Sequence, residues 1–85
     1  MNLFFIERYI QKIKKEDIYN YAQSQGLSLN KEELNILYNF LKTNYKIFFT
    51  NPDIRQKLLN ELKSKVSYQT ASKLEELYNQ YKNKI

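Results

Sequence analysis

The chain has 85 residues, a length typical of one small domain, in which folding buries about 60% of the surface that the unfolded chain exposes. It contains neither cysteine nor histidine, which excludes disulfides, thiolate or imidazole metal ligands, the commonest general base and the commonest nucleophile–base pairs. Its net charge of +5 is compatible with nucleic-acid binding, but Lys, Asn, Ile, Tyr and Phe make up half of the chain, as in proteins from AT-rich genomes, so the charge alone indicates little.

The first predicted helix has an apolar stripe of Leu3, Ile6 and Ile10. Phe4 falls outside this stripe, so its ring must be covered either by the segment 46–49 or by another chain. Aromatic side chains around this helix are therefore the candidate contact surface for a protein partner or a second copy. The predicted contact residues are Phe4, Phe5 and Tyr9, with Phe48 and Phe49 as neighbours.

Basic residues accompany the same helix. Residues 1–15 contain four basic residues and one acidic residue, a net charge of +3, whereas residues 16–30 contain two acidic residues and no basic one. A nucleic-acid-binding module is the alternative hypothesis, in which the basic side chains contact phosphates. Its predicted residues are Arg8, Lys12, Lys14 and Lys15, joined by Lys63 and Lys65.

A second helix is predicted from about residue 16 to 25, and it ends where Gly26 can adopt the left-handed conformation of a helix end. Asn30 then has the features of an N-cap for the third helix, with Glu33 three residues later to complete a capping box. Glu32 and Glu33 are expected to be solvated charges at the start of that helix.

The corner between these two helices has half the pattern of a DNA-binding helix-turn-helix, because Ala22 and Gly26 are correctly spaced. The apolar anchors of a recognition helix would fall on Glu32 and Asn35, however, and the turn is too long by about two residues. We therefore favour a structural corner. The alternative hypothesis, a nucleic-acid-binding module, would use this helix-turn-helix-like corner together with the basic N-terminal helix. The residues that resemble a SAP-type DNA-binding hairpin are Gly26, Leu27, Lys31, Leu34 and Leu37, but the second glycine and the basic residues of such hairpins are absent.

The third predicted helix is apolar over about 200° of its circumference, which predicts a central position. Residues 44–50 are expected to form the least regular connection, and Asn51 followed by Pro52 marks the start of a fourth helix. Arg55 lies on the apolar stripe of that helix, so its head should cap carbonyls or pair with a carboxylate, or else contact an anion or partner. Ser67 is the expected cap of a fifth helix.

Three turn motifs together resemble a known family. They are Gly-Leu-Ser-Leu-Asn-Lys-Glu-Glu (residues 26–33), Asn-Pro-Asp-Ile-Arg (51–55) and Ser-Tyr-Gln-Thr-Ala (67–71). They are similar to a family of short all-helical proteins from spore-forming Gram-positive bacteria of the Bacillales type, catalogued as a domain of unknown function. The resemblance implies no catalytic residue.

These patterns predict an all-α fold, a small bundle of four to five short helices with the third helix central, formed as a single domain by residues 1–85. The first and fifth helices are expected to pack around the third. The expected function is helix-mediated contact with a protein partner or a homodimer, with nucleic-acid binding as the alternative. We expect no enzymatic activity, no cofactor, no metal and no small-molecule substrate. Because no apolar run reaches about 18 residues and no signal peptide is evident, a soluble cytoplasmic protein with no membrane contact is expected.

Overall fold

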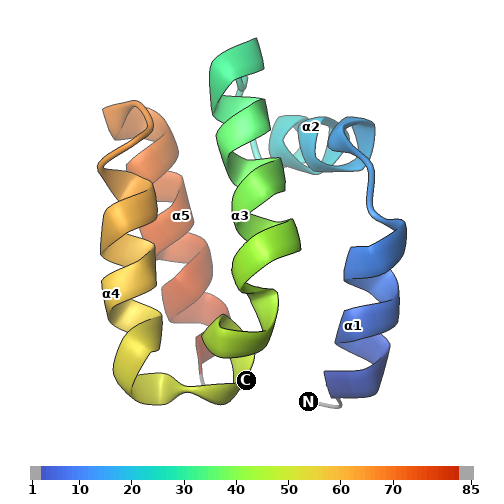
Figure 1. Cartoon of the computed structure of the whole chain (residues 1–85). Helices are drawn as coiled ribbons and strands as arrows, with labels where there is room; N and C mark the ends of the chain where they lie inside the picture. Colours follow the sequence, from blue (N-terminus) through green and yellow to red (C-terminus); the bar gives the residue numbers. More distant parts are fainter. Residues whose placement is uncertain (1–2, 83–85) are drawn as a thin grey trace.

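The computed structural model describes residues 3–82, and this part of the chain is helical with no strand (Figure 1). The helices are α1 (Leu3–Lys12), α2 (Lys15–Ser24), α3 (Lys31–Thr50), α4 (Pro52–Lys63) and α5 (Tyr68–Tyr81). None of them is long and apolar enough to cross a membrane. The prediction of a small all-α bundle is confirmed.

Three helices begin at the predicted caps. The Asn30 side chain accepts a hydrogen bond from the Glu33 amide at 2.7 Å, and the Glu33 side chain completes the capping box. The Asn51 side chain accepts from the first amides of α4, directly before the proline, and Ser67 accepts from the Thr70 amide. Each cap satisfies amides that have no partner within the helix, which fixes where these helices start.

Gly26 ends α2 as predicted, with a φ of +78°. The Leu27 amide donates to the Ala22 carbonyl at 2.9 Å, and the Gly26 amide donates to the Gln23 carbonyl at 3.0 Å. This pair of bonds is a Schellman motif, which needs a left-handed residue after the helix and therefore favours glycine.

The expected irregular connection over residues 44–50 is wrong, because α3 continues to Thr50. This segment contains no glycine or proline, and its Phe48 packs edge-on against Phe40, with ring centroids 5.9 Å apart. The helix ends only where Pro52 follows Asn51, since a residue before proline disfavours the helical conformation. Packing of the aromatic side chains thus extends the helix up to the first strong local stop signal.

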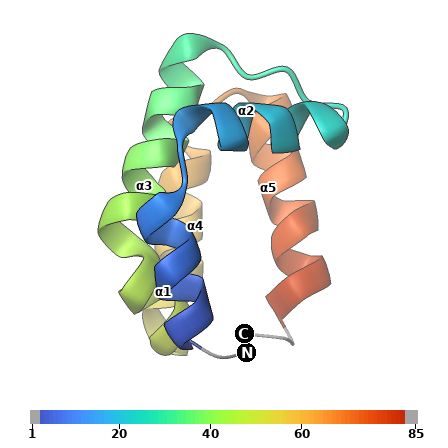
Figure 2. The same ribbon diagram turned by 90° about the vertical axis from the view of Figure 1, so that its right-hand side faces the viewer.

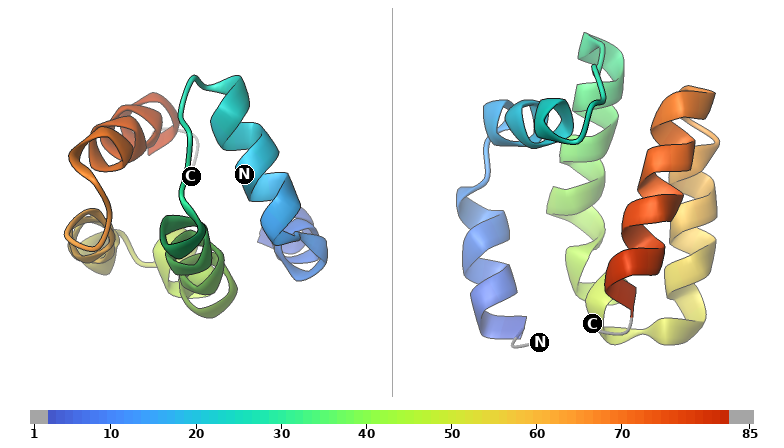
Figure 3. Two further views of the ribbon diagram at one scale, coloured as in Figure 1. Left: turned by 90° about the horizontal axis from the view of Figure 1, so that it is seen from above. Right: turned by 180° about the vertical axis from the view of Figure 1, so that it is seen from behind.

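Helix α3 is central, as predicted, and it lies between two pairs of helices (Figures 1 and 3). Helices α1 and α2 pack on one side of it and α4 on the other. Helix α5 packs along α4, so the expectation that it packs around the third helix is wrong for the helix backbones. Helix α5 reaches α3 only through side-chain contacts, such as that of Tyr78 with Phe48. The central buried cluster consists of Ile13, Ile18, Ala22, Leu29, Leu37 and Leu62.

Glu33 joins the start of α3 to the start of α5. Its carboxylate accepts a hydrogen bond from the Ser67 amide at 2.9 Å, and the residue is only 6% exposed, which corrects the expectation of a solvated charge. Burial by itself would raise the pKa of the Glu33 carboxyl, but hydrogen bonds from Ser67, Thr70 and Asn30 outweigh it and hold the pKa below its usual value. The buried carboxylate therefore stays charged between two helix N-termini, where negative charge is favourable.

Candidate interaction groove

An open apolar groove of about 410 Å³ lies between α2, α3 and α5, with α4 contributing to its base. Figure 2 shows the arrangement that produces it: α5 stands apart from α1 and α3, and α2 crosses one end of the space between them. Two contacts fix its ends, the Glu33 link at one and an edge-on contact of Phe48 with Tyr78 at the other, with ring centroids 6.1 Å apart. Its volume falls within the range of ligand pockets, about 300–1,000 Å³.

Apolar side chains line the groove almost entirely. The lining residues include Ile18, Tyr21, Ala22, Leu27, Leu29, Leu37, Phe40, Leu41, Tyr45, Phe48, Phe49, Leu59, Leu62, Leu74, Leu77 and Tyr78. The charged residue among them, Lys73, hydrogen-bonds to Glu76 at 3.4 Å. A groove of this composition can bury an apolar surface, but it offers no set of convergent polar groups for a polar substrate.

The predicted N-terminal contact residues lie on the outer face of α1. Phe4, Phe5 and Tyr9 are 58%, 67% and 64% exposed, so the segment 46–49 does not bury Phe4. The Phe4 and Phe5 rings meet edge-on at 5.9 Å, and the Arg8 guanidinium lies 5.7 Å from the centre of the Phe4 ring. We call Phe4, Phe5 and Tyr9 the α1 aromatic patch.

Phe48 and Phe49, predicted as neighbours of that patch, belong to the groove instead. Their rings lie 5.4 Å apart, and Phe48 also contacts Phe40 and Tyr78. The five predicted residues thus fall into two groups, the exposed α1 aromatic patch and one end of the groove.

Helix α1 is fastened to α3 by polar contacts beside the groove. The Lys42 ammonium donates to the Ile10 carbonyl at 2.7 Å, at the C-terminal end of α1. Burial, together with the neighbouring Glu7 carboxylate, raises the pKa of the Tyr45 hydroxyl, which hydrogen-bonds to Glu7. Lys46 lies 3.9 Å from the same carboxylate. These contacts hold α1 in place while its aromatic patch remains exposed.

The predicted basic residues are divided between the two sides of α3. Arg8, Lys12, Lys14 and Lys15 belong to α1 and its junction with α2, whereas Lys63 and Lys65 lie at the end of α4 (Figure 1). Several already have local partners: the Lys15 ammonium lies 5.5 Å from the centre of the Tyr38 ring, and Lys63 pairs with Glu75 at 2.6 Å. The central helix therefore separates the two groups.

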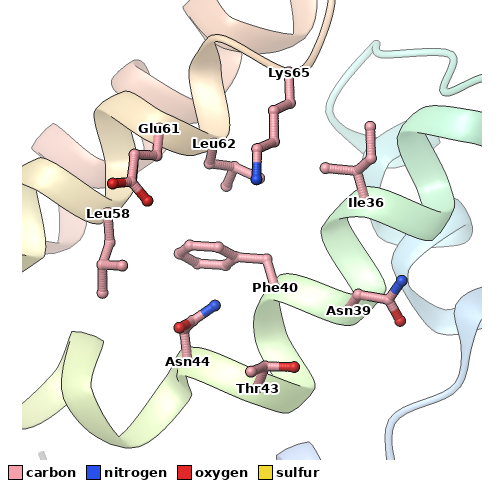
Figure 4. Close-up of a pocket in the computed structure, with 9 residues that line it drawn as sticks. All are labelled: Ile36, Asn39, Phe40, Thr43, Asn44, Leu58, Glu61, Leu62 and Lys65. Carbon is pink, nitrogen blue, oxygen red and sulfur yellow. The ribbon is translucent and has the colours of Figure 1, made fainter.

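A second, more polar pocket of about 320 Å³ lies between α3 and α4 (Figure 4). The Phe40 ring projects into its middle, with the Asn44 amide, the Glu61 carboxylate and the Lys65 ammonium around it. Glu61 and Lys65 are exposed to solvent. The lining of this pocket is a mixture of polar and apolar side chains, whereas the lining of the groove is almost entirely apolar.

The connection between α2 and α3 consists of residues 25–30, so the turn is as long as the sequence predicted. A helix-turn-helix has a turn of about 3–4 residues. The first turn of α3 is also occupied, since Asn30 and Glu33 cap the helix and Glu33 is buried.

The capping interpretation of Arg55 is confirmed. Its Nε donates to the Phe48 carbonyl at 2.7 Å, and a terminal guanidinium nitrogen donates to the Phe49 carbonyl at 3.4 Å. These carbonyls belong to the last turn of α3, where carbonyl oxygens have no amide donor within the helix. Arg55 thus holds the aromatic end of the groove against α4.

Leu74, Leu77 and Tyr78 recur at helical spacing in the sequence, but that spacing did not predict the groove that they line. A groove could have been indicated by a comparison of two areas: the apolar area on the predicted helices and the smaller area that the neighbouring helices can cover. Helical spacing gives the direction of a stripe within one helix, whereas its cover depends on where the other helices lie.

Residues 1–82 match the model of a family described as "Protein of unknown function (DUF2624)". No curated protein and no solved structure matched the chain.

Proposed function

Since the chain belongs to this family of proteins of unknown function, we propose its role from its surface: it is an interaction module whose groove receives an apolar helix face of another polypeptide. The observation behind the proposal is the open groove of about 410 Å³, lined by leucine, isoleucine and aromatic side chains from α2, α3 and α5. An amphipathic helix that binds in an apolar groove is a recurring mode of recognition.

Groove geometry supports a helix as the ligand. The walls are themselves helices, α2 and α3 on one side and α5 on the other, and α5 stands apart from α3 in the ribbon view (Figure 2). A further helix there would complete the bundle and would bury side chains at about 25 cal/mol per Å² of apolar area. Aromatic residues such as Phe48 and Tyr78 would be the anchor points, as is common at interfaces.

The proposed setting is the one expected from the sequence. We propose a non-enzymatic, cytoplasmic role in bacteria of the spore-forming Gram-positive group, without cofactor, metal or membrane contact. The chain contains no cysteine or histidine, and the groove has no convergent polar groups that could perform chemistry on a substrate.

Nucleic-acid binding is the second candidate function. The net charge of +5 and the exposed Lys12 and Lys14 favour it. The division of the basic residues by α3 disfavours it, because a phosphate backbone is contacted by a continuous basic surface.

Site-specific photo-crosslinking in cells tests the groove. A photo-reactive phenylalanine analogue at position Leu77 should crosslink to a second polypeptide, because this residue lines the groove. The matched control is the same analogue at Tyr68, which lies on the same helix but is 86% exposed. Absence of an adduct at position 77, or equal adducts at both positions, would contradict the proposal.

A further inference from the structure

We propose that the groove binds α1 of a second copy of this chain, in a reciprocal dimer in which each copy inserts its α1 aromatic patch into the groove of the other. The inference rests on the proposed function and names the occupant of the groove. It is drawn from three observations: a protruding apolar patch and an apolar groove in one chain, contacts that keep them apart within that chain, and the surface area that their pairing would bury.

The two surfaces are complementary in shape and chemistry. The patch consists of three aromatic rings spread over about 140° of the convex outer face of a helix, at 100° per residue, and each ring is more than half exposed. The groove is concave, open and lined by apolar side chains. Removing water from exposed aromatic side chains and from an apolar groove lowers the free energy of the system. Contact between the patch and the groove is therefore favourable.

The chain cannot pair these surfaces by itself in this fold. Lys42 holds the end of α1 through the Ile10 and Gln11 carbonyls, at 2.7 and 3.1 Å, and the Lys46 ammonium lies 3.9 Å from the Glu7 carboxylate. With α1 fixed in this way, Ile10 is buried against the core while the aromatic patch faces outward. Only another molecule can bring the patch to the groove.

The area that pairing would bury favours a reciprocal arrangement. A fully exposed aromatic side chain offers about 200 Å², so the exposed fractions of the three rings give a patch of about 380 Å². The groove exposes less surface than the patch, so one patch inserted in one groove would bury at most about 630 Å² in total, below the roughly 1,000 Å² that a specific interface needs. Two reciprocal insertions would bury at most about 1,250 Å², which exceeds that threshold.

A two-fold axis makes this reciprocal exchange a closed assembly. In such a dimer each contact occurs twice, from patch to groove and from groove to patch. A single unreciprocated contact would instead leave one patch and one groove open, and further copies would add to form a chain of molecules. A closed dimer is thus the arrangement that covers both surfaces.

Engineered cysteines test the pairing, because the natural chain contains none. Arg8→Cys places a thiol on the outer face of α1 without removing an aromatic ring, and Leu77→Cys places one in the groove. Under mild oxidation, a mixture of the two variants should form a disulfide-linked heterodimer more efficiently than either variant alone. A mixture of Arg8→Cys with Tyr68→Cys, on the exposed side of α5, is the matched control and should crosslink poorly.

The mass of the unmodified protein by light scattering, from micromolar to millimolar concentration, gives an independent result. We expect a concentration-dependent dimer, and the double change Phe5→Asp with Tyr9→Asp should raise its dissociation constant by about 100-fold. Circular dichroism should show unchanged helical content in this variant, because both side chains are exposed.

The outcomes separate this inference from the proposed function. A monomeric mass at every concentration, or crosslinking of Arg8→Cys or Leu77→Cys with itself as efficient as in the mixture, would overturn the reciprocal dimer. If photo-crosslinking at position 77 then captured a different protein, the groove would keep its proposed function with another ligand. If neither experiment detected a second chain, both proposals would fail.

Discussion

Glu33 is the residue whose removal should damage this fold most clearly. Its carboxylate accepts hydrogen bonds from the Ser67 amide at 2.9 Å and the Asn30 amide at 3.4 Å, and the residue is 6% exposed. Glu33→Ala would leave these partly buried donors without their acceptor, at up to about 1–3 kcal/mol for each unpaired group. Because the Asn30 bond is long, we expect a loss of about 3 kcal/mol in the free energy of unfolding.

Such a loss is large for a domain of this size. About 0.05–0.15 kcal/mol per residue gives a total stability of roughly 4–13 kcal/mol for this chain. A loss of 3 kcal/mol should lower the thermal midpoint by roughly 12–24 °C, at about 4–8 °C per kcal/mol. Thermal and urea denaturation, followed by circular dichroism, would measure both quantities.

Glu32→Ala is the matched control, since Glu32 lies in the same helical turn but is exposed. Exposed substitutions usually change stability by less than about 0.5 kcal/mol. If Glu33→Ala proved no more destabilising than Glu32→Ala, the carboxylate would not link α3 to α5, and the physical account of how the groove is held at that end would be refuted.

The stabilisation by Glu33 should also depend on pH in a defined direction. The pKa of this carboxyl is lowered in the folded state from its ordinary value of 4.5, so its contribution is complete above pH 4.5 and is lost as the pH falls through the folded-state pKa. The stability difference between the natural protein and Glu33→Gln should therefore be constant near neutral pH and shrink below pH 4.5. A difference that grew on acidification would contradict this sign.

Two further results are expected. Gly26→Ala should destabilise the protein by about 1–2 kcal/mol in urea denaturation, because the φ of +78° is unfavourable for a residue with a Cβ. No atom lies within 4 Å of the added carbon, so steric overlap would not contribute to the loss. An unchanged stability would mean that the turn can relax. Fluorescence anisotropy with labelled duplex DNA and single-stranded RNA should show weak binding that disappears between about 50 and 200 mM salt. Binding that remained tight at the higher salt would favour nucleic acid as the natural partner instead.

Much of the fold could be predicted because its signals are local. Asn30, Asn51 and Ser67 cap the helices that follow them, and Gly26 ends the helix before it, through hydrogen bonds that span only a few residues. The capping role of Arg55 could also be predicted, because the side chain reaches back to carbonyls in the preceding helix. Such contacts depend on spacing along the chain, and spacing is what the sequence shows directly.

The tertiary structure decided what the sequence could not. In the sequence, Glu33 looks like any acidic residue at a helix start, and only the position of α5 brings Ser67 and Thr70 against it. Lys42 looks like any lysine of a helix, and only the position of α1 brings the last carbonyls of that helix within its reach. The groove likewise exists only because α5 packs along α4 and leaves its apolar stripe facing α2 and α3 across an open space. Local spacing sets where each helix begins, ends and is apolar; which apolar faces meet, and which remain uncovered, depends on the balance of packing among all five helices at once.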